Sequence, residues 1–169
     1  NDIIHKALDI LDKLEHRGAV SADGKTGDGA GILIEIPHDF LSKQCDFELP
    51  ELNQYAVGMV FLPKKENQRT YCIGVFEAEL KKQGLEILGW RKVPVNPEVM
   101  GSIAAQTEPY IMQIFIGRGD KDLSDHEFNI KLFIARKIAE HTILSSKLSQ
   151  ASYFYLPSLS THTLIYKGL

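Results

Sequence analysis

Residues 14–37 read Leu-Glu-His-Arg-Gly-Ala-Val-Ser-Ala-Asp-Gly-Lys-Thr-Gly-Asp-Gly-Ala-Gly-Ile-Leu-Ile-Glu-Ile-Pro. Apolar residues at helical spacing precede this stretch, after the good N-cap residue Asp2, and Gly18 stands where a helix commonly stops. The glycine-rich centre cannot continue a helix and is typical of a loop that needs positive φ or a close backbone approach. The strand-like run Ile32–Ile36, closed by Pro37, then reads as a strand. The stretch therefore predicts a helix, a glycine loop and a strand in that order.

The glycine loop, residues 24–31, has two interpretations. In the functional one, several backbone N–H groups point at a small anion or a carboxylate, while Arg17, Lys25 and Asp28 fix its orientation. In the structural one, the segment is a helix stop followed by a tight loop. A phosphate-binding loop lies between a strand and a helix, whereas here a helix comes first and a strand follows. The local pattern therefore favours a structural loop, and a non-enzymatic module that binds a small anion or amino acid is the alternative function.

Hydrophobic periodicity predicts the remaining elements and a layered α/β or α+β domain. Ser124 and Glu127 form a capping box in front of the clearest helix pattern. The strands at 85–95 and 110–116 are expected to be buried, and residues 157–160 are expected to join the last two strands. We expect helices at 2–17, about 66–83 and 125–146, and strands at 32–36, 55–62, 85–95, 110–116, 152–156 and 161–166. Since no linker or repeat interrupts the pattern, residues 1–169 are predicted to be a single domain.

Composition excludes several classes of function. Lysine and arginine total 19 against 22 aspartate and glutamate, for a formal charge of -3, so neither nucleic acid nor an anionic membrane surface is indicated as a partner. The apolar runs are far shorter than the roughly 20 residues of a membrane span, and the start does not resemble a signal peptide. Cys45 and Cys72 are too few for a disulfide framework, and no metal motif is present. We expect a cytoplasmic protein without a metal site.

No residue is assigned a catalytic role by its local pattern. The histidines are scattered, and none is paired at ligand spacing. Ser158, Ser160, Thr161 and Thr163 offer hydroxyls, but no nucleophile-elbow or Ser-x-x-Lys motif activates them. Turn and strand positions explain these residues.

A resemblance runs in order along the whole chain. Leu14–Gly18 with Ser21-Ala22 resembles a segment near the start of class II glutamine amidotransferases. Thr26–Ile32 with Ile36-Pro37 resembles, within that family, the large chains of glutamate synthases. Further matches of the same kind are Arg91–Asn96, Gln113, Phe115, Ser158–Ser160 and Tyr166–Gly168.

The resemblance implies an N-terminal nucleophile hydrolase fold, an α+β sandwich of four layers, αββα. It also implies a cysteine nucleophile at the chain start, whose thiol attacks the glutamine side-chain amide while its own α-amino group serves as base. This sequence begins with Asn1, and both cysteines are internal. We therefore expect an internal part of the domain, a partial sandwich, that is inactive alone. The family's glutamine-clamping arginine and Asn-Gly oxyanion pair are expected after Tyr166–Gly168.

The resemblance assigns no catalytic residue within this chain. Motif residues expected to support the site are His16, Arg17, Gly18, Gly27, Asp28 and Gly29. In the intact protein, ammonia from glutamine would pass to 2-oxoglutarate, with FMN and an iron–sulfur cluster bound by other domains and no cofactor in this chain. Its expected partners are glutamine and the remaining domains, and an exposed sheet edge offers a contact for a homo-oligomer. Whether the electron donor is a pyridine nucleotide or ferredoxin stays open.

Overall fold

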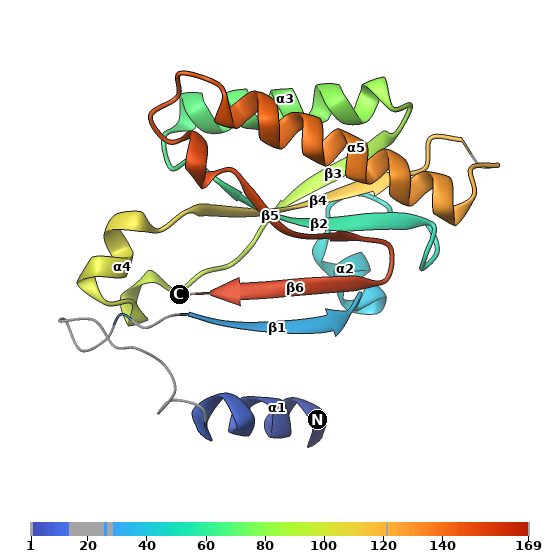
Figure 1. Cartoon of the computed structure of the whole chain (residues 1–169). Coiled ribbons are helices and arrows are strands. Elements are labelled where there is room, and N and C mark those ends of the chain that lie inside the picture. Colours follow the sequence, from blue (N-terminus) through green and yellow to red (C-terminus); the bar gives the residue numbers. More distant parts are fainter. Residues whose placement is uncertain (1, 14–25, 27–28, 121, 169) are drawn as a thin grey trace. The chain divides into compact units, whose positions relative to one another are not determined.

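The computed structural model describes residues 2–13, 26, 29–120 and 122–168 (Figure 1). The chain divides into two compact units. The first comprises residues 1–32, 95–108 and 166–169, and the second comprises residues 33–94 and 109–165.

The first unit contains α1 (Asp2–Lys13), the short 3-10 helix η2 (Pro97–Val99) and α4 (Ser102–Thr107). Ion pairs one turn apart, Lys6 with Asp2 and Lys13 with Asp9, lie along α1. The helix predicted from residue 2 is thus confirmed as far as residue 13, and residues 14–17 lie outside the described part of the chain. The glycine stop predicted at Gly18 lies outside it as well.

A four-stranded antiparallel sheet forms the centre of the second unit. Its strand order is β3 (Glu86–Lys92), β4 (Tyr110–Gly117), β2 (Tyr55–Leu62) and β5 (Tyr155–Ser160). The central pair β2–β4 is in continuous register from Tyr55 opposite Gly117 to Leu62 opposite Tyr110. Both strands were predicted within one residue of their observed ends, because a largely apolar run bounded by Pro63 or Pro109 marks each of them.

Two long helices, α3 (Glu66–Lys82) and α5 (Asp125–Leu144), lie on one face of this sheet (Figure 1). The capping box predicted at Ser124 and Glu127 is present at the start of α5. The predicted apolar stripe of α5 is its buried side: Phe128, Leu132, Ala135, Ala139 and Ile143. These residues join buried side chains of α3 and of the sheet in the main hydrophobic core. The helices and antiparallel strands make an α+β fold, as predicted.

The opposite face of the sheet contacts α2 (His38–Gln44), a helix that periodicity did not predict. It has seven residues and a single buried one, Leu41, so it is too short to show an apolar stripe. The strands β1 (Ala30–Glu35) and β6 (Thr163–Gly168) form a separate two-stranded sheet.

Two expectations about the strands were wrong. β3 was expected to be buried, but most of its residues are only half-buried because it is an edge strand. Residues 157–160 were expected to form a turn, but they belong to β5, which follows the short helix η3 (Ala151–Tyr153). Pro157 is tolerated there because β5 is the other edge, and because the register with β2 shifts between Met59 and Phe61.

Within the described residues, none of the helices combines the length and the apolar character that crossing a membrane requires. The same residues contain no group of three or more histidine, cysteine, aspartate or glutamate side chains arranged to hold a metal ion.

Candidate functional site

The strand pair β1–β6 carries two of the motif segments that the sequence singled out. A Cβ built on Gly31 would lie 3.2 Å from the carbonyl oxygen of Tyr166, so only a glycine fits without displacing that backbone. At the other end of the pair, the Ile36 N–H donates to the carbonyl oxygen of His162 over 2.9 Å. The strands therefore run in opposite directions, and Gly31 at the start of β1 lies next to Tyr166 near the end of β6.

Gly29 is the one predicted motif residue that the structure describes. Its φ of 86° lies in the left-handed region, which glycine adopts without the penalty that a side chain would add. The sequence had predicted such a conformation for this loop. The other motif residues, His16, Arg17, Gly18, Gly27 and Asp28, lie outside the described residues. Their role in supporting the site stays a prediction.

Thr26 gives the loop a contact with a distant helix in the first unit. Its Oγ1 accepts a hydrogen bond of 3.2 Å from the backbone N–H of Ala104, in the first turn of α4. The N-cap residue of α4 is Gly101, which has no side chain to satisfy that N–H. Thr26 therefore acts as a cap supplied from elsewhere in the sequence, which favours the structural interpretation of the loop at this position.

A charged hydrogen bond lies on the α2 side of the four-stranded sheet. Arg91 on β3 donates from Nη1 to Oε1 of Gln113 on β4 over 2.8 Å, and Gln113 is completely buried. The guanidinium carbon of Arg91 lies 5.8 Å from the centre of the Phe40 ring of α2. Both polar residues belong to the segments that carried the resemblance, and the structure brings them together. The buried amide of Gln113 satisfies part of the guanidinium, and a bond of this kind is worth roughly 1.5–3 kcal/mol.

A second polar contact lies on the same face, between α2 and β2. The hydroxyl of Tyr55, a fully buried residue, is 3.0 Å from Nδ1 of His38. The Tyr55 ring packs against Phe115, with ring centres 6.3 Å apart. Burial, with a smaller contribution from nearby Cys45, raises the pKa of Tyr55 to about 12. Tyr55 is therefore a neutral hydrogen-bonding group at physiological pH and not a base.

Neither cysteine has the surroundings of a nucleophile. Cys72 on α3 is completely buried, and burial raises its thiol pKa to about 11. Burial also raises the pKa of Cys45. The charge of Arg91 lowers this pKa in part, and the charge of Asp46 raises it further. A reactive thiol needs a lowered pKa, because the thiolate is the attacking species. Both cysteines are therefore protonated, structural residues near neutral pH.

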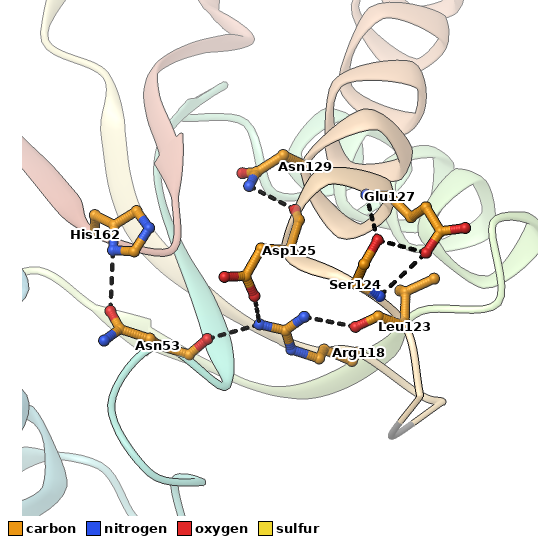
Figure 2. A network of polar contacts seen from close by, with 8 residues as sticks. All are labelled: Asn53, Arg118, Leu123, Ser124, Asp125, Glu127, Asn129 and His162. Carbon is orange, nitrogen blue, oxygen red and sulfur yellow. Dashed lines mark hydrogen bonds and ion pairs between the residues drawn. The ribbon is translucent and has the colours of Figure 1, made fainter.

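A network around Arg118 connects three loops at one end of the four-stranded sheet (Figure 2). Arg118 follows β4 directly and is only 8% exposed. Its Nη1 donates to the carbonyl oxygen of Leu123 over 2.7 Å, and its Nη2 donates to the carbonyl oxygen of Asn53 over 3.0 Å. Nη2 also forms an ion pair with Asp125, in the first turn of α5. The guanidinium thus joins the loop before β2 to the start of α5.

Asn53 extends this network to the turn between β5 and β6. Its side-chain Oδ1 is 3.0 Å from Nδ1 of His162, so that His162 donates when Nδ1 carries the proton. Asn53 is the one non-glycine residue in the described chain with a positive φ, 69°. Figure 2 shows the His162 ring facing the Asn53 amide, while the Asn53 carbonyl faces Arg118.

Local sequence patterns did not identify this network. His162 was one of several scattered histidines, and Asn53 stands in a polar loop like many others. The available signal was Arg118 itself, a charged residue immediately after an apolar strand and shortly before the capping box. A buried arginine requires acceptors from neighbouring segments, but the sequence does not say which segments are neighbours.

Comparison with known proteins gives a consistent family. The sequence model of the class II glutamine amidotransferases matches residues 1–169. The glutamate synthase [NADPH] large chain of Bacillus subtilis (strain 168) is 42% identical over 171 residues, which cover 100% of this chain and 11% of that protein.

Two eukaryotic relatives are also similar over almost the whole chain, which again covers only a small share of their own length. The ferredoxin-dependent chloroplastic glutamate synthase of Oryza sativa subsp. japonica is 40% identical over 99% of this chain and 10% of its own length. The glutamate synthase [NADH] of Saccharomyces cerevisiae (strain ATCC 204508 / S288c) is 36% identical over 98% of this chain and 8% of its own length. The chain thus spans about a tenth of the length of the curated relatives that it matches.

Proposed function

Because the chain belongs to the class II glutamine amidotransferase family, we propose that it forms part of the glutamine-hydrolysing domain of a glutamate synthase. The observation that carries the proposal is the strand pair β1–β6, in which Gly31 lies against the backbone of Tyr166. Two segments that resemble the family, more than a hundred residues apart in the sequence, thus meet at one place in the fold.

The reaction expected of this family requires a thiol and a free α-amino group on one residue. The thiol attacks the side-chain amide of glutamine, the amine accepts the proton, and ammonia leaves from a tetrahedral intermediate. Cys45 and Cys72 are internal, and the surroundings of both raise the thiol pKa. We therefore propose that the nucleophile belongs to sequence outside these 169 residues, and that the 169-residue chain alone does not hydrolyse glutamine.

The residues of this chain would then support the site without touching the reacting atoms. We propose this role for the set predicted from the motif: His16, Arg17, Gly18, Gly27, Asp28 and Gly29. The left-handed backbone of Gly29 and the contact of Thr26 with α4 support the role, since both shape the loop before β1. Within this proposal, residues 1–169 are an internal part of one amidotransferase domain.

For the intact protein, we propose that the ammonia passes to 2-oxoglutarate and yields glutamate. The names of the relatives, all glutamate synthases, and their greater length support this assignment. FMN and an iron–sulfur cluster would belong to other domains, which are the proposed partners of this one. We further propose a cytoplasmic location, consistent with the free thiols of Cys45 and Cys72. The edge strands β3 and β5 are where a second copy of the chain would pair.

A glutaminase assay tests the proposal. Ammonia release from glutamine is measured with the purified 169-residue chain and with the intact protein. We expect release by the intact protein only, and we expect the intact Cys45→Ala variant to retain it. Release by the 169-residue chain that Cys45→Ala abolishes would contradict the proposal.

Calorimetry separates the alternative function from the proposed one. The 169-residue chain is titrated with glutamine, glutamate and inorganic phosphate. We expect no heat of binding at micromolar concentrations. Micromolar binding of phosphate by this chain, together with an intact protein that releases no ammonia, would favour the small-anion module with the loop at 24–31.

A further inference from the structure

The turn between β5 and β6 is held by His162 through three separate bonds. Its backbone N–H donates to Oγ of Ser160 over 3.1 Å, and its carbonyl oxygen accepts from the N–H of Ile36 over 2.9 Å. Its side chain meets Asn53. His162 therefore lies where the turn, the end of β1 and the loop before β2 come together.

Asn53 is suited to this contact by its backbone. Asparagine tolerates the left-handed region better than most residues, and in this conformation its carbonyl and its side chain face different partners. The carbonyl accepts from Arg118, and the side-chain oxygen is paired with His162. One residue thus joins the buried guanidinium to the β5–β6 turn.

Arg118 gives the contact a fixed support. Its side chain is held at both ends of the guanidinium by Leu123, Asn53 and Asp125. The guanidinium also lies 5.1 Å from the centre of the Phe128 ring of the core. Within the described part of the chain, its Nε is buried without a hydrogen-bond partner. A charged group buried at this cost is tolerated only where the rest of its contacts are good.

We propose that Asn53 and His162 are positioning residues for the glutaminase reaction. Held by Arg118, they fix the start of β6 and the end of β1, and so the strand pair in which Gly31 meets Tyr166. This inference rests on the proposed function and adds to it the residues that set the geometry of the strand pair. None of them touches glutamine in this role. They act because a displacement of about 1 Å at a reacting centre costs as much as a hundredfold in rate.

The test uses two variants of Asn53 that both accept its backbone conformation. Asn53→Gly removes the side chain and keeps the left-handed φ, whereas Asn53→Asp keeps an acceptor oxygen for His162. Each is made in the intact protein. Hydrogen exchange is followed by mass spectrometry in peptides that cover β1 and β6, with peptides of β2 and β4 as the internal reference. Glutaminase kcat and KM are measured on the same samples.

We expect Asn53→Gly to raise exchange about five- to tenfold in the β1 and β6 peptides and to leave those of β2 and β4 unchanged, as the loss of one hydrogen bond predicts. We expect kcat to fall about tenfold, with the protein fully folded at the assay temperature. Asn53→Asp should keep both the exchange in β1 and β6 and the kcat at the level of the unsubstituted protein. His162→Phe should match Asn53→Gly, and the double variant should be no worse than either, since the two residues act as one unit.

Three results would overturn the inference. Unchanged exchange in β1 and β6 removes its structural basis, and unchanged kcat in a variant with faster exchange removes the positioning role. Equal losses in Asn53→Gly and Asn53→Asp show that the side-chain oxygen is not what matters. Failure of the proposed function gives a different result, because the unsubstituted intact protein then releases no ammonia at all.

Discussion

On the face of the four-stranded sheet that α3 and α5 cover, the buried strand side chains of the main core are apolar, and Val60, Ile114 and Ile116 are completely buried there. On the opposite face Tyr55 and Gln113 are buried to the same extent, although both are polar. The apolar residues need only neighbours of the right volume, whereas each polar residue needs one specific partner, supplied by another segment. The first face can therefore tolerate exchange of its residues for others of similar volume, while the second depends on the pairs His38–Tyr55 and Arg91–Gln113.

The largest effect is expected in the core under the helices. Phe128→Ala should lower the free energy of unfolding by about 4 kcal/mol, because it empties a completely buried site of the main core. The matched control is Phe133→Ala on the same helix, where the side chain is 61% exposed and the expected loss is within about 0.5 kcal/mol. Urea denaturation of both variants measures the difference. Equal losses would show that α5 does not bury the face that the structure assigns to it.

On the polar face, Gln113→Leu should lower the free energy of unfolding by about 2 kcal/mol, because it removes the side-chain oxygen that accepts from the Arg91 guanidinium. The Arg91→Met variant and the double variant complete a thermodynamic cycle. We expect the double variant to lose about 1 kcal/mol less than the two single losses added together. Additive losses would mean that the two side chains do not depend on each other, and the contrast between the faces would disappear.

The N-cap of α5 should contribute less to stability than the core or the polar face. Ser124→Ala removes the side chain that accepts from the Glu127 N–H, and it should lower the free energy of unfolding by about 1 kcal/mol. Ser145 is the C-cap residue at the other end of the helix, and it caps through its backbone N–H, which alanine keeps. Ser145→Ala should therefore lower the free energy of unfolding by less than about 0.5 kcal/mol. Thermal unfolding of both variants distinguishes the two ends. A larger loss at Ser145 would contradict the capping assignment.

A separate effect, confined to alkaline pH, is expected from Tyr55. Burial raises its pKa in the folded state to about 12, above the unfolded value of 10.0. The unfolded chain therefore releases this proton first, so the stability that the neutral hydroxyl contributes is present below pH 10 and is lost as the pH rises toward 12. Tyr55→Phe should remove this part of the pH dependence. Urea titrations at pH 9 and pH 11 test it, with Tyr71→Phe at a partly exposed position as the control.

The contrast between the apolar face and the polar face also explains which parts of the structure could be predicted from the sequence. The stripe of α5 and the strands β2 and β4 were predicted closely, because burial against one neighbour leaves an apolar pattern in the chain itself. β5 was misplaced, because proline was taken to end a strand when it stands within an edge strand. α2 was missed because seven residues with one buried side chain carry no periodicity.

The polar contacts were less predictable than the core. Arg91 and Gln113 were singled out through the resemblance alone, and nothing local indicated that they meet. Asn53, Arg118 and His162 come from three loops that are distant in sequence, so their meeting is a property of the sheet topology. Gly29 is different, because the need for a positive φ is visible in the glycine itself.

The hydrogen bond from Ala104 to Thr26 also bears on the order of folding. It closes a loop of 78 residues, and the first unit, to which both residues belong, is assembled from three separate stretches of the chain. Closing so long a loop costs entropy before the contact is gained, which slows the formation of non-local structure. We expect the second unit to form first and to bring the ends of the first unit together. In a refolding experiment, protection of the Ala104 amide should then appear later than protection of the β2 and β4 amides.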